Sequence, residues 1–163
     1  MTDQTKWVYD LNEGDASLKP LLGGKGANLA EMHRIGVPVP DAFTVTTQAC
    51  VASMNNDGEW PEGLADQIDA GLARLEERTG KKLGSAENPL LVSIRSGAVF
   101  SMPGMMDTIL NLGISDDTVD SVAKLADNER FAWDCYRRFV QMYGEVVEGI
   151  APNVFEDALT EMK

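Results

Sequence analysis

The chain has 163 residues, of which 44% are hydrophobic and 25% charged, and its formal net charge is −12. This composition fits one globular domain, or part of one, and no apolar run approaches the length that spans a bilayer. The negative charge argues against nonspecific binding to nucleic acid or to an anionic membrane, so any anionic ligand requires a local cluster of lysine and arginine. The first residues lack the pattern of a secretory signal, which favours a cytoplasmic protein.

Before residue 64 the sequence predicts, in order, a strand, a short helix, a strand, a short helix and a turn region, at residues 6–11, 26–36, 42–47, 48–54 and 55–63. The first strand follows from the alternation of Trp7 and Tyr9 with their neighbours. Gly36 is suited to end the first helix, and Thr46 or Thr47 precedes the second.

A longer helix is expected next, because apolar residues repeat at four, four and three residues and Gly80 ends the pattern. The repeating residues are Leu64, Ile68, Leu72 and Leu75. The apolar run at 89–95 then predicts a buried strand that ends in Arg95.

After Ser115 the composition becomes helical, with Asp116 or Asp117 as the expected cap of a helix that carries Val119, Val122 and Leu125. A second, longer helix presents an apolar stripe of Phe131, Cys135, Phe139, Met142 and Val146. The acidic residues after Pro152 offer no evident closing element. The pattern therefore predicts an α+β fold, with an α/β subdomain at 1–114 and a helical subdomain at 115–163 that looks truncated.

Cysteine and histidine give little evidence of a metal or redox site. Cys50 and Cys135 are too few for a disulfide framework, and we expect both to be reduced, packed thiols. His33, the only histidine, is expected to be exposed or half-buried, with no cluster of metal ligands around it. No pair of nucleophile and base stands out.

The stretch "LLGGKGANLAEM" is the first candidate binding site. Lys25 lies among Gly23, Gly24 and Gly26 just before the expected helix. Glycines let backbone N–H groups approach a ligand, a helix start carries partial positive charge, and Lys25 adds a full one, a combination that suits a phosphate. Taken alone, such a turn is more often a flexible helix entry with a solvated lysine. It is not the common P-loop, because Gly26 follows Lys25 where Ser or Thr is required.

The second candidate is "SIRSGAVFSMPGMMDTILNLG", which begins at Ser93. Arg95 stands at a strand end, where ligands gather in sheet-based folds. Gly104 frees the backbone, and methionines such as Met106 supply a deformable apolar lining for a base or a neighbouring domain. The alternative is that the methionines only fill gaps in the core.

Arg138 is a third candidate, on the polar face of the last predicted helix. Asp134 precedes it by one turn, so an exposed ion pair between the two is a sufficient explanation for this arginine.

Four segments together resemble the N-terminal part of the pyruvate, phosphate dikinase family. They are "NEGDASLKPLLGGKGANLAEM", "GVPVPDAFTVTTQAC", "LLVSIRSGAVFSMPGMMDTILNLG" and "RFAWDCYRRFVQMYG". They follow the family's order and cover most of the chain. The run "SMPGMMDTILNLG" resembles the dikinases rather than the related phosphoenolpyruvate synthases.

The resemblance implies a partial ATP-grasp-like nucleotide-binding domain that recognises the polyphosphate of ATP. The family converts ATP, phosphate and pyruvate to AMP, pyrophosphate and phosphoenolpyruvate, with Mg²⁺ and a phosphohistidine carrier. By motif, Lys25, Arg95 and Arg138 resemble the cationic groups of the site, and the loop with Gly104 and Met106 resembles its phosphate cover.

The resemblance also places the metal-binding carboxylates, the carrier histidine and the pyruvate site in later parts of the family's chain. The expected partners are therefore ATP or phosphate and the remainder of a dikinase polypeptide, whose full form is a homodimer. No nucleic acid or membrane partner is expected. A stand-alone, non-catalytic nucleotide-binding or regulatory module is the alternative.

Overall fold

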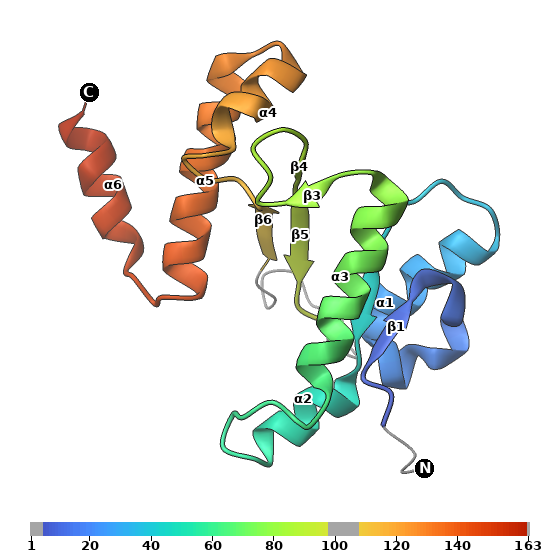
Figure 1. Ribbon diagram of the computed structural model, residues 1–163. Coiled ribbons are helices and arrows are strands. Elements are labelled where there is room, and N and C mark those ends of the chain that lie inside the picture. The colour runs from blue at the N-terminus through green and yellow to red at the C-terminus, as the bar shows by residue number, and fades with distance from the viewer. Residues whose placement is uncertain (1–4, 98–107, 163) are drawn as a thin grey trace. The chain divides into compact units, whose positions relative to one another are not determined.

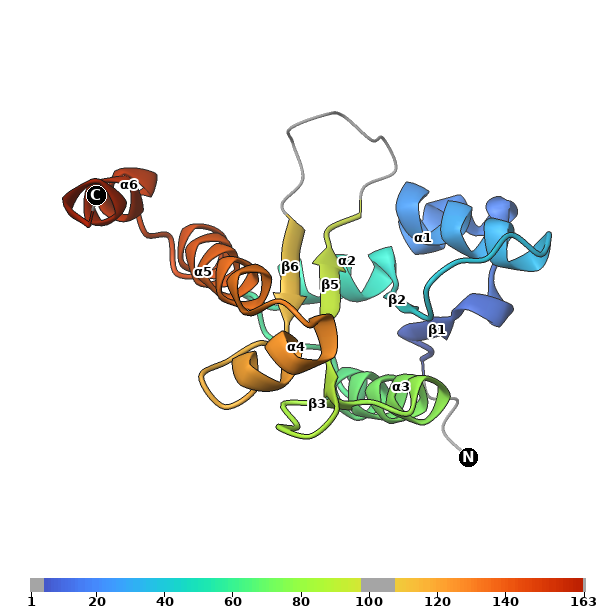
Figure 2. The ribbon, with the colours of Figure 1, turned by 90° about the horizontal axis from the view of Figure 1, so that it is seen from above.

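The computed structural model describes residues 5–97 and 108–162, which form two compact units (Figures 1 and 2). The first unit comprises the described residues up to Gly80 together with Gly97. The second comprises Lys81–Ser96 and residues 108–162. Both combine helices with small sheets, which confirms the α+β class. The boundary expected at residue 114 stays a prediction.

The first unit packs helices around a two-stranded antiparallel sheet. Val8 lies opposite Val45, and Asp10 opposite Phe43. Buried Val8, Ala49 and Leu64 form its core. The elements are β1 (Val8–Asp10), the short 3-10 helices Leu11–Glu13 and Ala16–Leu18, α1 (Lys19–Arg34), β2 (Phe43–Val45), α2 (Thr47–Met54) and α3 (Leu64–Thr79).

Most elements expected in this part of the chain are confirmed. Thr46 caps α2 by accepting a hydrogen bond from the backbone N–H of Ala49 at 3.2 Å. Gly80 ends α3 in the left-handed conformation, with φ of 65°. Leu64 and Leu75 of the α3 stripe are buried. Cys50 is exposed, so the expectation that it is packed is wrong.

Helix α1 departs from the expectation, because it begins at Lys19 and not at residue 26. Gly23 interrupts it with φ of 70° and ψ of 170°, a backbone conformation that is essentially restricted to glycine. The glycine-rich turn is therefore a break inside a helix, and the part expected as a helix is its second segment.

The second unit combines short strands with three helices among its described residues. Strand β3 (Lys82–Leu83) is parallel to β4 (Pro89–Leu90), and β5 (Val92–Arg95) is antiparallel to β6 (Thr108–Leu112). The helices are α4 (Val119–Ala126), α5 (Glu129–Val146) and α6 (Pro152–Glu161). Buried Ile114, Val119, Val122 and Ala132 form the core of the unit.

Two expectations about the strand and the first helix of this unit are wrong. The run 89–95 forms two strands, and Ile94 in the second is 50% exposed, so the run is not one buried strand. Thr118, and not an aspartate, is the N-cap of α4. Its hydroxyl accepts from the backbone N–H of Ser115 and donates to the carbonyl of Gly113, so it is fully buried with its polar atom satisfied.

The last two helices also depart from the sequence pattern. Cys135 and Phe139 of the α5 stripe pack on the core, whereas Phe131 is 52% exposed. Helix α6 was not expected. Pro152 at its start and the spacing of Phe155 and Leu159 are its sequence signals.

We predict that Gly113→Ala destabilises the second unit strongly. Gly113 has φ of 109°, and an added Cβ would collide with the carbonyl oxygen of Leu90 and lie 2.9 Å from Leu83 Cδ1. Backbone strain and the collision together should lower the free energy of unfolding by about 2–4 kcal/mol, measured by urea denaturation. Gly84→Ala is the control, because φ there is 72° but nothing lies within 4 Å, so only about 1 kcal/mol is expected. Equal losses for the two variants would contradict the steric argument.

Candidate phosphate-binding site

Lys25 lies in the first turn of α1 after the break at Gly23. The lysine is half-buried, and Gly23 and Gly24 before it are buried. A helix start carries partial positive charge from its aligned peptide dipoles, and the lysine adds to it. Lys25 therefore lies inside α1, in the segment that begins after the break, and not just before the helix as expected.

Close packing fixes the backbone on both sides of this break. On one side, the Thr47 hydroxyl donates to the carbonyl oxygen of Pro20 at 2.7 Å. On the other side, Gly26 lies so close to β2 that a Cβ added to it would be 2.8 Å from Thr44 Cγ2 and 2.9 Å from Thr44 Oγ1. Packing on Thr44 alone is thus sufficient to explain the glycine at position 26.

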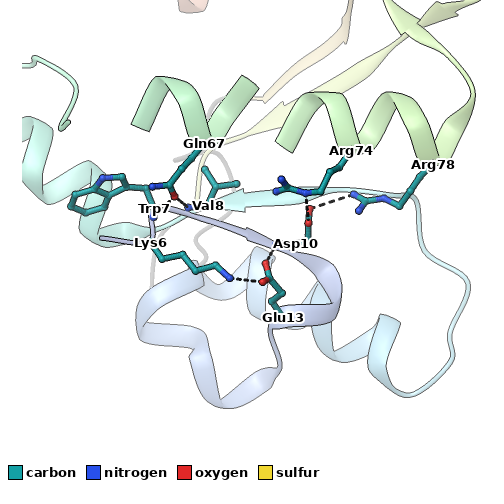
Figure 3. A network of polar contacts seen from close by, with 8 residues as sticks. All are labelled: Lys6, Trp7, Val8, Asp10, Glu13, Gln67, Arg74 and Arg78. Atoms are coloured by element: carbon teal, nitrogen blue, oxygen red, sulfur yellow. Dashed lines mark hydrogen bonds and ion pairs between the residues drawn. The ribbon is translucent and has the colours of Figure 1, made fainter. Parts of the chain in front are cut away.

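Side chains of α3 hold β1, the strand that pairs with β2 (Figure 3). The Gln67 Oε1 atom accepts hydrogen bonds from the backbone N–H groups of Trp7 at 2.7 Å and of Val8 at 3.2 Å. The Gln67 amide nitrogen in turn donates to the carbonyl of Thr5 at 2.8 Å. One glutamine therefore holds the start of β1 against the helix.

An ion-pair network continues along the same helix (Figure 3). Asp10 Oδ2 lies 2.6 Å from Arg74 Nε, and Asp10 Oδ1 lies 3.4 Å from a terminal nitrogen of Arg78. The Asp10 side chain is only 12% exposed. Arg78 also pairs with Asp41 at 3.3 Å. The carboxylates neutralise these arginines, so the network binds β1 to α3 and is not an anion site.

Glu13 extends the network just after β1, next to Asp10. It forms an ion pair with Lys6 and accepts from the backbone N–H of Asp10 at 2.9 Å. Partial burial raises the pKa of Glu13, but hydrogen bonds from Lys6 and from Asp10 outweigh it, so that the pKa lies below its ordinary value. Sequence reasoning missed this network, because its members are up to 68 positions apart.

Arg95 is the last residue of β5, as expected, and lies opposite Thr108 of β6. Arg95 is exposed, and no carboxylate among the described residues forms an ion pair with it. An arginine that is not already paired keeps its planar fork of donors for a bidentate contact with phosphate.

Arg138 of α5, in contrast to Arg95, already forms an ion pair. Its Nε lies 2.8 Å from Asp134 Oδ2, and the side chain is 64% exposed. The same carboxylate group accepts from Arg137 at 3.1 Å, and this hydrogen bond, with the charges of both arginines, lowers the pKa of Asp134. The exposed ion pair that the spacing suggested is therefore present.

The candidate residues are divided between the two units. Lys25 belongs to the first unit, and Arg95 and Arg138 belong to the second, where β5 pairs with β6 and α5 packs on β6. Gly104 and Met106 lie outside the described residues. The convergence of Lys25, Arg95 and Arg138 on one anion site therefore stays a prediction.

The structure shows no metal site among the described residues. In residues 5–97 and 108–162, no group of three or more His, Cys, Asp or Glu side chains is arranged to hold an ion. His33 is exposed on α1, as expected. None of the helices in the described part of the chain is long and apolar enough to cross a membrane.

Comparison with known proteins gives the family. The model of the pyruvate phosphate dikinase AMP/ATP-binding domain matches residues 19–82, which include the Gly23 break and Lys25. Curated pyruvate, phosphate dikinases from Clostridium symbiosum and Rhizobium meliloti (strain 1021) are 54% and 50% identical to it, each over 97% of this chain. The enzyme from Entamoeba histolytica is 49% identical over 96%. The chain belongs to the pyruvate, phosphate dikinase family.

The match covers nearly all of this chain but a small part of its relatives. The chain spans 18% of the length of each of these three dikinases and corresponds to their N-terminal part. It therefore represents the N-terminal AMP/ATP-binding region of a pyruvate, phosphate dikinase.

We predict that Asp10→Asn destabilises the first unit more than Asp41→Asn. Asp10 is nearly buried and faces two arginines, so loss of its charge should lower the free energy of unfolding by about 1–3 kcal/mol. Asp41 is 43% exposed and makes one ion pair at 3.3 Å, which predicts a loss of about 0–1 kcal/mol. Urea denaturation of both variants measures the difference. Equal losses would show that the Asp10 network adds nothing beyond a surface pair.

Proposed function

We propose that this chain provides part of the ATP site of a dikinase that converts ATP, phosphate and pyruvate to AMP, pyrophosphate and phosphoenolpyruvate. The single observation that carries the proposal is the identity of about half of all residues to such enzymes over 97% of this chain. On this proposal the domain is ATP-grasp-like, and Lys25, Arg95 and Arg138 contact the polyphosphate together with the loop that contains Gly104 and Met106.

The chemistry of phosphoryl transfer explains why these residue types are needed. Catalysis of that transfer consists mainly of positioning the phosphates and neutralising the charge that develops on their oxygens. Arg95 offers a planar fork for two phosphate oxygens from a strand end. Lys25 offers a single charge at a helix start.

The three cations are not equivalent. Arg138 is already paired with Asp134, so binding a phosphate would require it to exchange that partner or to share it. Arg95 has no described carboxylate to release. The net gain on binding should therefore be larger for Arg95 than for Arg138.

The remaining parts of the reaction belong to other parts of a dikinase. We assign the Mg²⁺ ligands, the phosphohistidine carrier and the pyruvate site to regions outside this chain. The partners on this proposal are ATP and the rest of the dikinase polypeptide, in a cytoplasmic homodimer. Mg²⁺, when bound, would neutralise charge on the phosphates beside the residues named above.

We predict that the 163-residue polypeptide alone forms no phosphoenolpyruvate from ATP, phosphate and pyruvate. The relatives that it matches are more than five times longer, and the proposed carrier and pyruvate sites are not assigned to it. A coupled assay for phosphoenolpyruvate with Mg²⁺ measures this. Steady turnover by the purified chain would contradict the assignment of those sites to other regions.

We predict that Arg95→Ala impairs the ATP half-reaction most. In a full-length dikinase polypeptide that contains this segment, loss of a bidentate phosphate contact should cost about 2–3 kcal/mol, or roughly 30- to 150-fold in AMP release. Lys25→Ala should be impaired less, and Arg138→Ala least. Arg130→Ala is the matched control, since Arg130 is an exposed arginine on α5. The phosphate assignment is wrong if Arg95→Ala and Lys25→Ala both keep the parent rate.

A further inference from the structure

The contact between Gly26 and Thr44 sets the position of the turn that carries Lys25. Gly26 directly follows Lys25, and Thr44 lies in the middle of β2, where its backbone pairs with Tyr9 of β1. The side chain of Thr44 fills the space that a Cβ at position 26 would need. Contacts at 2.8–2.9 Å are shorter than any that an ordinary Cβ makes, so either Gly26 or Thr44 must move if a methyl group is added.

Helix α1 is interrupted near this contact, so the helix itself does not fix the direction of the segment that carries Lys25. At Gly23 the chain leaves helical geometry. The backbone hydrogen bonds between residues i and i−4 of α1 therefore do not orient Lys25 relative to the residues before the break. Two contacts from the β2–α2 region supply that orientation. Thr47 holds Pro20 before the break, and Thr44 packs on Gly26 after it.

The strand that carries Thr44 is itself well supported. Strand β2 pairs with β1, and β1 is bound to α3 through Gln67 and Asp10 (Figure 3). Thr44 therefore presents a stable surface, and Gly26 lies against it. A shift of this surface relative to α1 would move the Lys25 backbone directly.

We propose that Thr44 and Gly26 are positioning residues for Lys25 in the ATP half-reaction. The inference rests on the proposed function, because it takes Lys25 as a phosphate-binding group. Neither residue needs to touch the nucleotide. Their role is to hold the lysine where a phosphate oxygen is reached, and a displacement of about 1 Å in such a group lowers rates by roughly 100-fold.

The contact can be tested by adding a methyl group at position 26 and by removing the Thr44 atoms that it would meet. Gly26→Ala adds a Cβ against Thr44, and Thr44→Ala removes the two atoms, Oγ1 and Cγ2, that this Cβ would meet. In the double variant, the next neighbour of the new Cβ is Leu22 Cβ at 3.3 Å, a distance that a small adjustment relieves. The double variant should therefore restore the position of the turn.

The measurement is kcat/KM for ATP in AMP release by the full-length dikinase polypeptide, together with the thermal midpoint of each variant. Gly26→Ala should lower kcat/KM about 10- to 100-fold. Thr44→Ala should lower it a few-fold, because the turn loses a packing contact. The double variant should recover to within about fivefold of Thr44→Ala, a non-additive result expected for residues in contact. In a Lys25→Ala background, Gly26→Ala should cost little more.

Gly144→Ala is the matched control for simple destabilisation. Gly144 lies in α5 of the second unit, and an added Cβ would lie 2.5 Å from Phe155 Cζ of α6. This variant strains a contact between helices that involves neither β2 nor the Lys25 turn. It should lower the thermal midpoint and leave kcat/KM within about twofold of the parent value.

Each result bears on a different claim. If Lys25→Ala keeps the parent rate, the phosphate role of Lys25 is wrong and the positioning role falls with it. If Lys25→Ala is impaired but Gly26→Ala is not, only the positioning role is wrong. It is also wrong if Thr44→Ala fails to rescue Gly26→Ala, or if Gly26→Ala costs as much without Lys25 as with it.

Discussion

The backbone conformation of Gly23 is the constraint on which the candidate site depends. With φ of 70° and ψ of 170°, the residue leaves helical geometry within a segment that is helical on both sides. A side chain at this position would be strained by about 1–3 kcal/mol, and Gly23 is also buried. The break gives the chain a second helix start in the middle of α1. It is there, and not at the first residue of the helix, that Lys25 is found.

The consequence is that tertiary contacts replace the rigidity that a continuous helix would provide. Packing of Gly26 on Thr44 and the hydrogen bond from Thr47 to Pro20 are both made by residues around β2 and the start of α2. Strand β2 depends in turn on β1, which is held by α3. Positioning of one lysine thus involves most elements of the first unit.

Local patterns predicted the elements whose signals lie within a few residues. The spacing of Leu64 and Leu75 with Gly80 gave the bounds of α3, and Thr46 marked the start of α2. Where the outcome depended on distant partners, the pattern failed. The run at 89–95 reads as one apolar strand, but Leu90 is buried whereas Ile94 lies exposed in a separate strand. Helix α6 was missed because its Phe155 packs at Gly144, a residue of α5 that carries no apolar signal.

Sequence reasoning selected the residues of the candidate site but not the contacts that hold them. Motif resemblance selected Lys25 and Arg95, and comparison with the dikinases confirmed the family. Their supports were not visible in the sequence, because Thr44 has no distinctive spacing to Gly26, and Asp10 is 64 positions from Arg74. Only packing distances and ion-pair partners reveal such contacts.

The double hydrogen bond to Gln67 has a consequence for how the first unit behaves in solution. A sheet of two short strands leaves backbone donors open on its outer side, and another polypeptide can add to them as a further strand. The side-chain oxygen of Gln67 occupies the N–H groups of both Trp7 and Val8. The glutamine therefore satisfies these two N–H groups within the molecule, so neither is available to a strand of another polypeptide. Without Gln67, both donors would be open to hydrogen bonds with such a strand.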